Sequence, residues 1–223
     1  MADTADPNKE KEESALVRLL VVVTAVTGAV DAVSILRLGH VFVANMAGNV
    51  TFLGFAVAGA PGFSISASVV ALGAFLVGAF AGGRMPKLAP RGMLTRITAL
   101  EAVLVGAASV VSVTAQGAGA RYTMTALLAV AMGGQNATAR ELGVPDMTTS
   151  VLTMTLTGLA ADEPDFTKVG THSQRRVAAV IAMLAGAVAG ALLVLNTSTG
   201  WSLGTAAALL ASVSAAARVL DNS

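Results

Sequence analysis

About six long stretches of this chain carry almost no charged residues, and each is long enough to cross a lipid bilayer. A helix rises about 1.5 Å per residue, so about 20 apolar residues span a hydrocarbon core of about 30 Å. The mean hydropathy of +0.74 and the charged fraction of 12% agree with this. We therefore expect an all-α, multi-pass membrane protein in contact with the lipid bilayer. The expected transmembrane helices cover residues 16–36, 64–83, 93–113, 121–140, 175–196 and 201–219.

Two further apolar segments, residues 44–60 and 147–161, are too short for an upright crossing. We expect both to be half-helices that enter the membrane and return, which is tolerated where they are buried in protein. Eight crossings with tilted short helices are the alternative. That arrangement would move the basic residues between the second and third spans to the outside, against the usual bias.

Basic residues predict the orientation of the chain, because Lys and Arg near membrane ends favour the cytoplasm. With six crossings they gather on one side, and only Arg37 and Arg121 fall on the other. We therefore expect a protein of the cell membrane with both termini in the cytoplasm. Residues 1–14 are polar and mixed in charge, which predicts a disordered cytoplasmic tail.

The two halves of the chain, residues 15–113 and 121–219, share one order of elements. Each has a span ending in a polar cluster, then a short segment, then two spans. Gly28-Ala-Val-Asp31-Ala corresponds to Gly133-Gly-Gln135-Asn136-Ala. Since each half has an odd number of spans, the second half is expected to be inverted relative to the first, an architecture that recurs among transporters.

Two signatures carry a resemblance to a known family. The first is TGAVDAVS at residues 27–34 with GHVFVANMAGN at 39–49; the second is MGGQNA at 132–137 with threonines at 148, 149 and 153. Together they resemble the YoaK-like family of uncharacterised bacterial membrane proteins, domain of unknown function 1275, over nearly the whole chain. Ala47 and Met154 depart from the threonine and glycine usual there. The resemblance implies fold class and localisation, and no activity.

Two carboxylates are expected inside the membrane, Asp31 near the end of the first span and Glu101 within the third. An ionised carboxylate costs a few kcal/mol at such depth, so each should face the protein interior and find a partner. Either residue is a candidate site for a proton or cation. The alternative for both is a purely structural role.

Amide side chains form the second group of candidates for a substrate pathway. Asn45 and Asn49 lie one helical turn apart at the start of the first short segment, where Asn45 is suited to cap a helix. The free N–H groups of a half-helix N-terminus can face a solute. Gln135 and Asn136 occupy the corresponding place in the second half. Capping and interhelical hydrogen bonds are the competing interpretation for all four.

Most catalytic classes lack a signature in this sequence. The chain has no cysteine and two histidines, which argues against thiolate chemistry and a histidine-built metal centre. It contains no P-loop, HExxH or GxSxG motif and no basic patch interleaved with aromatic residues. We expect a protein that is not an enzyme, needs no cofactor or metal and binds no nucleic acid; a homo-oligomer is left open.

These observations favour a small secondary transporter or permease for an unknown small solute or ion, with coupling to protons or cations left open. The alternative is a non-catalytic structural or regulatory membrane subunit, in which the polar clusters only lock helices together. A wet cavity lined by Asp31, Asn45, Asn49, Gln135 and Asn136 would favour transport. A dry, fully packed centre would favour the structural interpretation.

Overall fold

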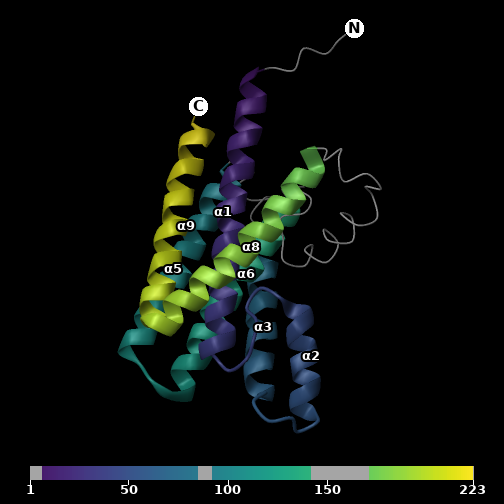
Figure 1. Ribbon diagram of the computed structural model, residues 1–223, viewed down its shortest axis with the longest axis vertical. Coiled ribbons are helices and arrows are strands. Elements are labelled where there is room, and N and C mark those ends of the chain that lie inside the picture. The colour runs from purple at the N-terminus through teal and green to yellow at the C-terminus, as the bar shows by residue number, and fades with distance from the viewer. Residues whose placement is uncertain (1–6, 85–91, 142–170, 223) are drawn as a thin grey trace.

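The computed structural model describes residues 7–84, 92–141 and 171–222, and in these ranges every regular element is a helix. The expected segment 147–161 lies outside the described residues. Figure 1 shows the helices as a bundle with both chain ends at the same end of the molecule. The helices are α1 (Pro7–Arg37), α2 (Met46–Val57), α3 (Ile65–Gly82), α5 (Met93–Thr114), α6 (Gly117–Glu141), α8 (Thr171–Asn196) and α9 (Thr199–Asp221).

Among the described residues, five segments are both long and apolar enough to cross a membrane: Ser14–Arg37, Ile65–Gly82, Met93–Thr114, Val177–Asn196 and Thr199–Asp221. The expected span at 121–140 is present as the 25-residue helix α6, but α6 is not among them. Its glycines, threonines and amides lower its hydropathy. Much of α6 is buried against other helices, including Met124, Leu128 and Met132, so its surroundings are protein more than lipid.

Two helix boundaries differ from the sequence expectation. Helix α1 begins at Pro7, so half of the expected tail at 1–14 belongs to a helix; Lys and Glu, which dominate residues 8–13, are good helix formers. Helix α6 begins at Gly117, four residues before the expected span at 121–140, which leaves a tight connection after α5. The small residues there carry no hydropathy signal, yet alanine favours the helix strongly.

Six of the described helices pack as three pairs. The pairs α1–α8 and α3–α6 are parallel, and the antiparallel pair α5–α9 contacts them through α1 and α6. Helix α1 packs along α8, α3 packs along α6, and α5 packs against both α9 and α6. In Figure 1, α1 and α8 descend from the end that holds the termini, whereas α9 ascends towards it. At the far end, Arg37 of α1 donates a hydrogen bond of 2.9 Å to the carbonyl of Val194 on α8.

Glycines bring the parallel couples into backbone contact. A Cβ at Gly78 or Gly82 would collide with the α6 backbone at Val130 or Gly134. A Cβ at Gly186 or Gly190 would likewise collide with the α1 backbone at Ala25 or Ala29. Membrane helices associate through such close approach, because lipid supplies no hydrophobic drive between them. The partner helices also carry glycines at these contacts. A Cβ at Gly133 would collide with the α3 backbone, and a Cβ at Gly28 with the α8 backbone.

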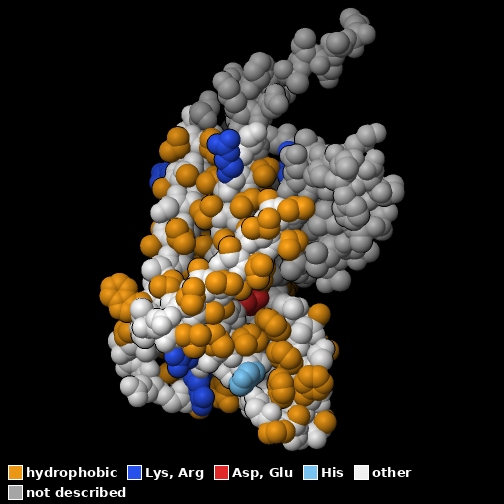
Figure 2. Space-filling model, viewed as in Figure 1, with side chains coloured by type: hydrophobic (Ala, Val, Ile, Leu, Met, Phe, Trp, Pro, Cys, Tyr) orange, Lys and Arg blue, Asp and Glu red, His pale blue; other side chains and the backbone are white. Residues whose placement is uncertain are grey.

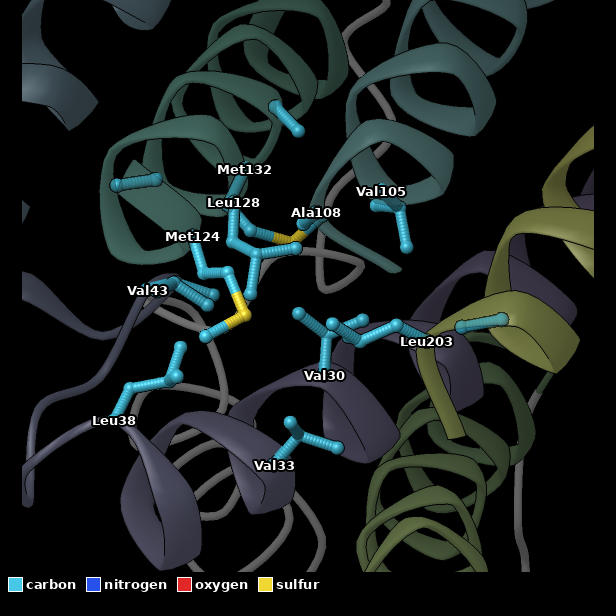
Figure 3. Packing of buried hydrophobic residues seen from close by; sticks show 14 of the residues in the cluster. Val30, Val33, Leu38, Val43, Val105, Ala108, Met124, Leu128, Met132 and Leu203 are labelled. Atoms are coloured by element: carbon cyan, nitrogen blue, oxygen red, sulfur yellow. The ribbon is translucent and has the colours of Figure 1, made fainter. Parts of the chain in front are cut away.

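The core lies where α1, α5, α6 and α9 meet. Figure 3 shows Val30, Val105, Met124, Leu128 and Leu203 converging from these helices, and their side chains are 0 to 6% exposed. Large hydrophobic side chains also cover the outside, as Figure 2 shows over one face. Outward-facing examples are Leu76, Phe80, Leu184 and Trp201. Apolar side chains on both the inside and the outside are what a lipid-embedded bundle requires.

Helix α2 has 12 residues and is therefore about 18 Å long, too short to cross the hydrocarbon core. It lies beside α3, its main contact (Figure 1). Four phenylalanines pack together at this corner, with Phe52 between Phe42 (5.5 Å between ring centroids) and Phe63 (5.0 Å). The side of α2 that carries Val50 and Val57 is exposed.

Candidate functional site

Asp31 holds the connection between α1 and α2. One carboxylate oxygen accepts hydrogen bonds from the backbone N–H groups of Val43 (3.0 Å) and Ala44 (3.1 Å). Its other oxygen has no hydrogen-bond partner among the described residues, and the side chain is 5% exposed. Asp31 lies six positions before the end of α1, so these N–H groups lie about 9 Å inside that end. The chain therefore turns back into the molecule before α2 begins.

Asn49 fixes the same connection from the other side. Its side-chain amide donates to the carbonyl of Phe42 (2.6 Å), and its side-chain oxygen accepts from the N–H of Phe42 (2.8 Å). Asn49 is completely buried. Asn45 caps α2 by accepting from the N–H of Gly48 (3.3 Å), as the sequence predicted. Both polar atoms of the Asn49 side chain and the side-chain oxygen of Asn45 are thus engaged by the local backbone.

Gln135 links α6 to α1. Its side-chain amide donates a hydrogen bond of 2.9 Å to the hydroxyl of Thr27, one turn before Asp31. Beside it lies a cavity of about 10 Å³, lined by Leu20, Val23, Leu94, Ile97, Thr98, Gln135, Thr138 and Ala139. Such a volume is about that of a single water molecule. Asn136 donates only to the carbonyl of Met132 in its own helix (2.9 Å).

Glu101 lies on α5, close to the middle of that helix, and is 0% exposed. Neither of its carboxylate oxygens has a hydrogen-bond partner among the described residues. The buried hydroxyls of Ser68, Thr125 and Thr138 are unpartnered in the same sense. In native structures buried polar groups are nearly always hydrogen-bonded, so a carboxyl group without a partner requires an explanation.

The sequence candidates therefore separate into three places. Asp31, Asn45 and Asn49 surround the α1–α2 connection, Gln135 and Asn136 lie on α6, and Glu101 lies on α5. Thr27 joins the first two places, because it bonds Gln135 and lies one turn from Asp31. Sequence reasoning missed Thr27 as a site residue, because a threonine inside a span most often bonds its own helix and so gives no signal.

Residues 19–216 match a family described as a protein of unknown function, DUF1275. The chain belongs to this DUF1275 family. A curated relative is the UPF0700 transmembrane protein YoaK of Bacillus subtilis, 31% identical over 148 residues. The match covers 65% of each chain, so the chain spans slightly less than two thirds of that relative. No solved structure matches the chain significantly.

Membership of DUF1275 agrees with the bundle of apolar helices. The family resemblance drawn from the two signatures is confirmed. The DUF1275 match covers every described helix in whole or in part, and it includes all six candidate residues. This chain is accordingly a multi-pass transmembrane protein.

Proposed function

We propose that this DUF1275 protein is a small secondary transporter or permease of the cell membrane, built from two inverted three-helix repeats. The glycine contacts between its parallel helix couples are the observation that carries the proposal. Inverted repeats place a substrate site near the membrane midplane, at the interface of the two halves. Transport, rather than catalysis, is the role that such an architecture serves.

The glycine contacts support a repeat because they correspond position by position. Gly78 and Gly82 face Val130 and Gly134, just as Gly186 and Gly190 face Ala25 and Ala29. Matched residues of the two halves are separated in the sequence by roughly 105 to 108 positions. This nearly constant offset is expected of duplicated units. Under this correspondence α1, α3 and α5 match α6, α8 and α9, and matched helices run in opposite directions in Figure 1.

An alanine substitution tests whether the two couples are equivalent. Gly78→Ala and Gly186→Ala should each destabilise the protein by about 2 kcal/mol, because the new Cβ meets backbone. Gly73→Ala is the matched control, since nothing lies within 4 Å of a Cβ at Gly73. Thermal unfolding in detergent measures all three. A large loss for only one of the first two variants would contradict equivalent interfaces.

Six crossings with both termini in the cytoplasm complete the proposal. Helix α6 has 25 residues and packs along α3, which is itself a candidate span, and this supports a sixth crossing. Exposed arginines then gather at the end holding the termini, whereas Arg37 and Arg121 lie at the opposite end. The first group comprises Arg18, Arg84, Arg96, Arg140 and Arg218.

A cysteine introduced at exposed Gly119 of this cysteine-free chain should react with an impermeant reagent from outside; reaction only from the cytoplasm would contradict the orientation.

The α1–α2 connection supports a re-entrant half-helix. The backbone leaves α1, returns to the depth of Asp31 and enters α2 there. Irregular backbone at such depth is tolerated because Asp31 and Asn49 satisfy its N–H and C=O groups. A carboxylate already accepts from the N–H groups that directly precede the N-cap of α2. This arrangement favours a neutral solute, proton or cation over an anion.

A structural or regulatory subunit is the second candidate, favoured by the dense centre. The cavity beside Gln135 holds about 10 Å³, room for about one water molecule, so the region around Gln135 is closed in the conformation described. A transporter must open this region to water in another conformation. Gln135→Cys should therefore react with small thiol reagents in native membranes, and complete protection under all conditions would favour the subunit.

Flux measurement tests the transport function directly. Purified protein in proteoliposomes should carry protons, or one of a set of neutral and cationic compounds tested in turn, across the vesicle membrane. Protein-free vesicles are the control. Asp31→Asn distinguishes coupling from structure. Loss of pH-dependent flux with intact folding indicates coupling, whereas unchanged flux with altered thermal stability refutes a coupling role for Asp31.

A further inference from the structure

Glu101 is buried in α5, the helix of the first proposed half that packs against α6 and α9 of the second. It is less than one turn from the midpoint of α5. Ser109 donates to the carbonyl of Gly200 and Ser214 donates to that of Thr95, which ties α5 to α9 on both sides of Glu101. Counting along these antiparallel helices puts Glu101 level with Ala208, between the buried side chains of Ala206 and Leu210. On α6, Ile97 lies against Gly134, and the same count puts Glu101 level with Val130, next to buried Ala129.

The charged groups of the helices around Glu101 lie near helix ends and point outward. On α5, α6 and α9 the titratable groups are Arg96, Arg121, Tyr122, Arg140, Glu141, Arg218 and Asp221. All are exposed except Tyr122, which is partly buried. On α1, which meets α5 beside Leu94 and Ile97, Arg18 and Arg37 are exposed and Asp31 bonds backbone N–H groups. None of these described side chains hydrogen-bonds Glu101.

A carboxylate in this position would be an uncompensated buried charge. Taking an ion out of water without a partner is far more costly than burying a neutral polar group. Asp31 shows what an accommodated carboxylate looks like here, because two N–H groups converge on one of its oxygens. Glu101 has no such donors among the described residues, so only the neutral acid fits the closed packing.

We propose that Glu101 is a proton-binding site at the centre of the membrane domain. It carries a proton on its carboxyl group in the closed conformation and releases that proton to water when α5 separates from α6 or α9. The release restores an ionised carboxylate that water solvates, and no other bond changes. Its role in coupling rests on the proposed transport function, whereas the presence of the proton does not.

Infrared spectroscopy of the purified protein in lipid tests the bound proton without any substrate. At neutral pH the wild type should show a protonated-carboxyl stretching band that shifts in D₂O. Glu101→Gln should remove the band and Asp31→Asn should retain it. Glu101→Asp, which keeps an acid on a shorter side chain, should change its frequency. A wild type without the band, or a band that survives Glu101→Gln, overturns the proposal.

Proton movement then tests coupling separately. The interior of proteoliposomes that contain the wild type, followed with an internal pH dye, should acidify when a potassium diffusion potential is imposed. With Glu101→Gln the rate should fall to that of empty vesicles. Equal rates for both proteins overturn coupling at Glu101 while transport stands. Correct infrared results with no acidification by the wild type support the proton site and count against proton-coupled transport.

Discussion

Asp31 and Glu101 are both buried acidic residues of membrane-spanning helices, and the protein treats them differently. Asp31 lies near the end of α1, where a backbone turn supplies two N–H donors. Glu101 lies near the middle of α5, where neighbouring helices present apolar side chains and no donor among the described residues. The comparison indicates that one carboxyl group builds the fold, and that the other is retained for a reason that packing does not supply.

The largest expected effect comes from removing the acceptor at Asp31. Asp31→Ala removes the oxygen that accepts hydrogen bonds from the N–H groups of Val43 and Ala44 and should cost about 3 kcal/mol of stability. Thermal unfolding in detergent measures the loss. Asp31→Asn retains an oxygen acceptor and should cost about 1 kcal/mol. An alanine variant as stable as the wild type would break the structural half of the comparison.

Asn49 and Asn45 sharpen the comparison within α2. Asn49→Ala removes both bonds to Phe42 in a fully buried site and should cost about 2 kcal/mol. Asn45→Ala removes only a partly exposed N-cap and should cost about 1 kcal/mol. The two variants are compared by the same unfolding assay. The reverse order would mean that the cap, rather than the Asn49 amide, holds the connection.

The smallest effect is expected at Glu101. Glu101→Gln exchanges one neutral, unpartnered polar group for another of the same shape, so stability at neutral pH should change by less than about 1 kcal/mol. Glu101→Leu removes the unpartnered group and should raise stability by about 1 kcal/mol. Unfolding temperatures of the purified variants measure both. A strong loss with Gln would show that Glu101 is ionised and paired, contrary to the comparison.

Much of the local structure could be predicted from residue patterns. The predicted spans at 64–83 and 93–113 agree with α3 and α5 within a residue or two, since apolar runs of that length have few alternatives. The short segment at 44–60 contains α2, with Asn45 as its cap. Helix α6 was harder to delimit, because its glycines and amides weaken the hydropathy signal that defines a span.

The candidate site was predicted by residue type, but its organisation was not. Asp31, Asn49 and Gln135 were expected to line a pathway. In the structure Asp31 bonds Val43 and Ala44, Asn49 bonds Phe42, and Gln135 bonds Thr27. Partners such as Phe42 bond through their backbone groups, and no pattern of side chains in the sequence predicts such bonds.

The sequence alone determined the class of protein, the presence of an apolar helical bundle and the residues that must avoid lipid. It could do so because the cost of placing polar groups in hydrocarbon depends on each segment by itself. Only the tertiary structure decided which acid is partnered. Asp31 is bonded because the chain folds back beside α1, and Glu101 is left alone because α5 meets Ala and Leu faces of α6 and α9. Those encounters depend on the packing of helices distant in sequence, which no local pattern encodes.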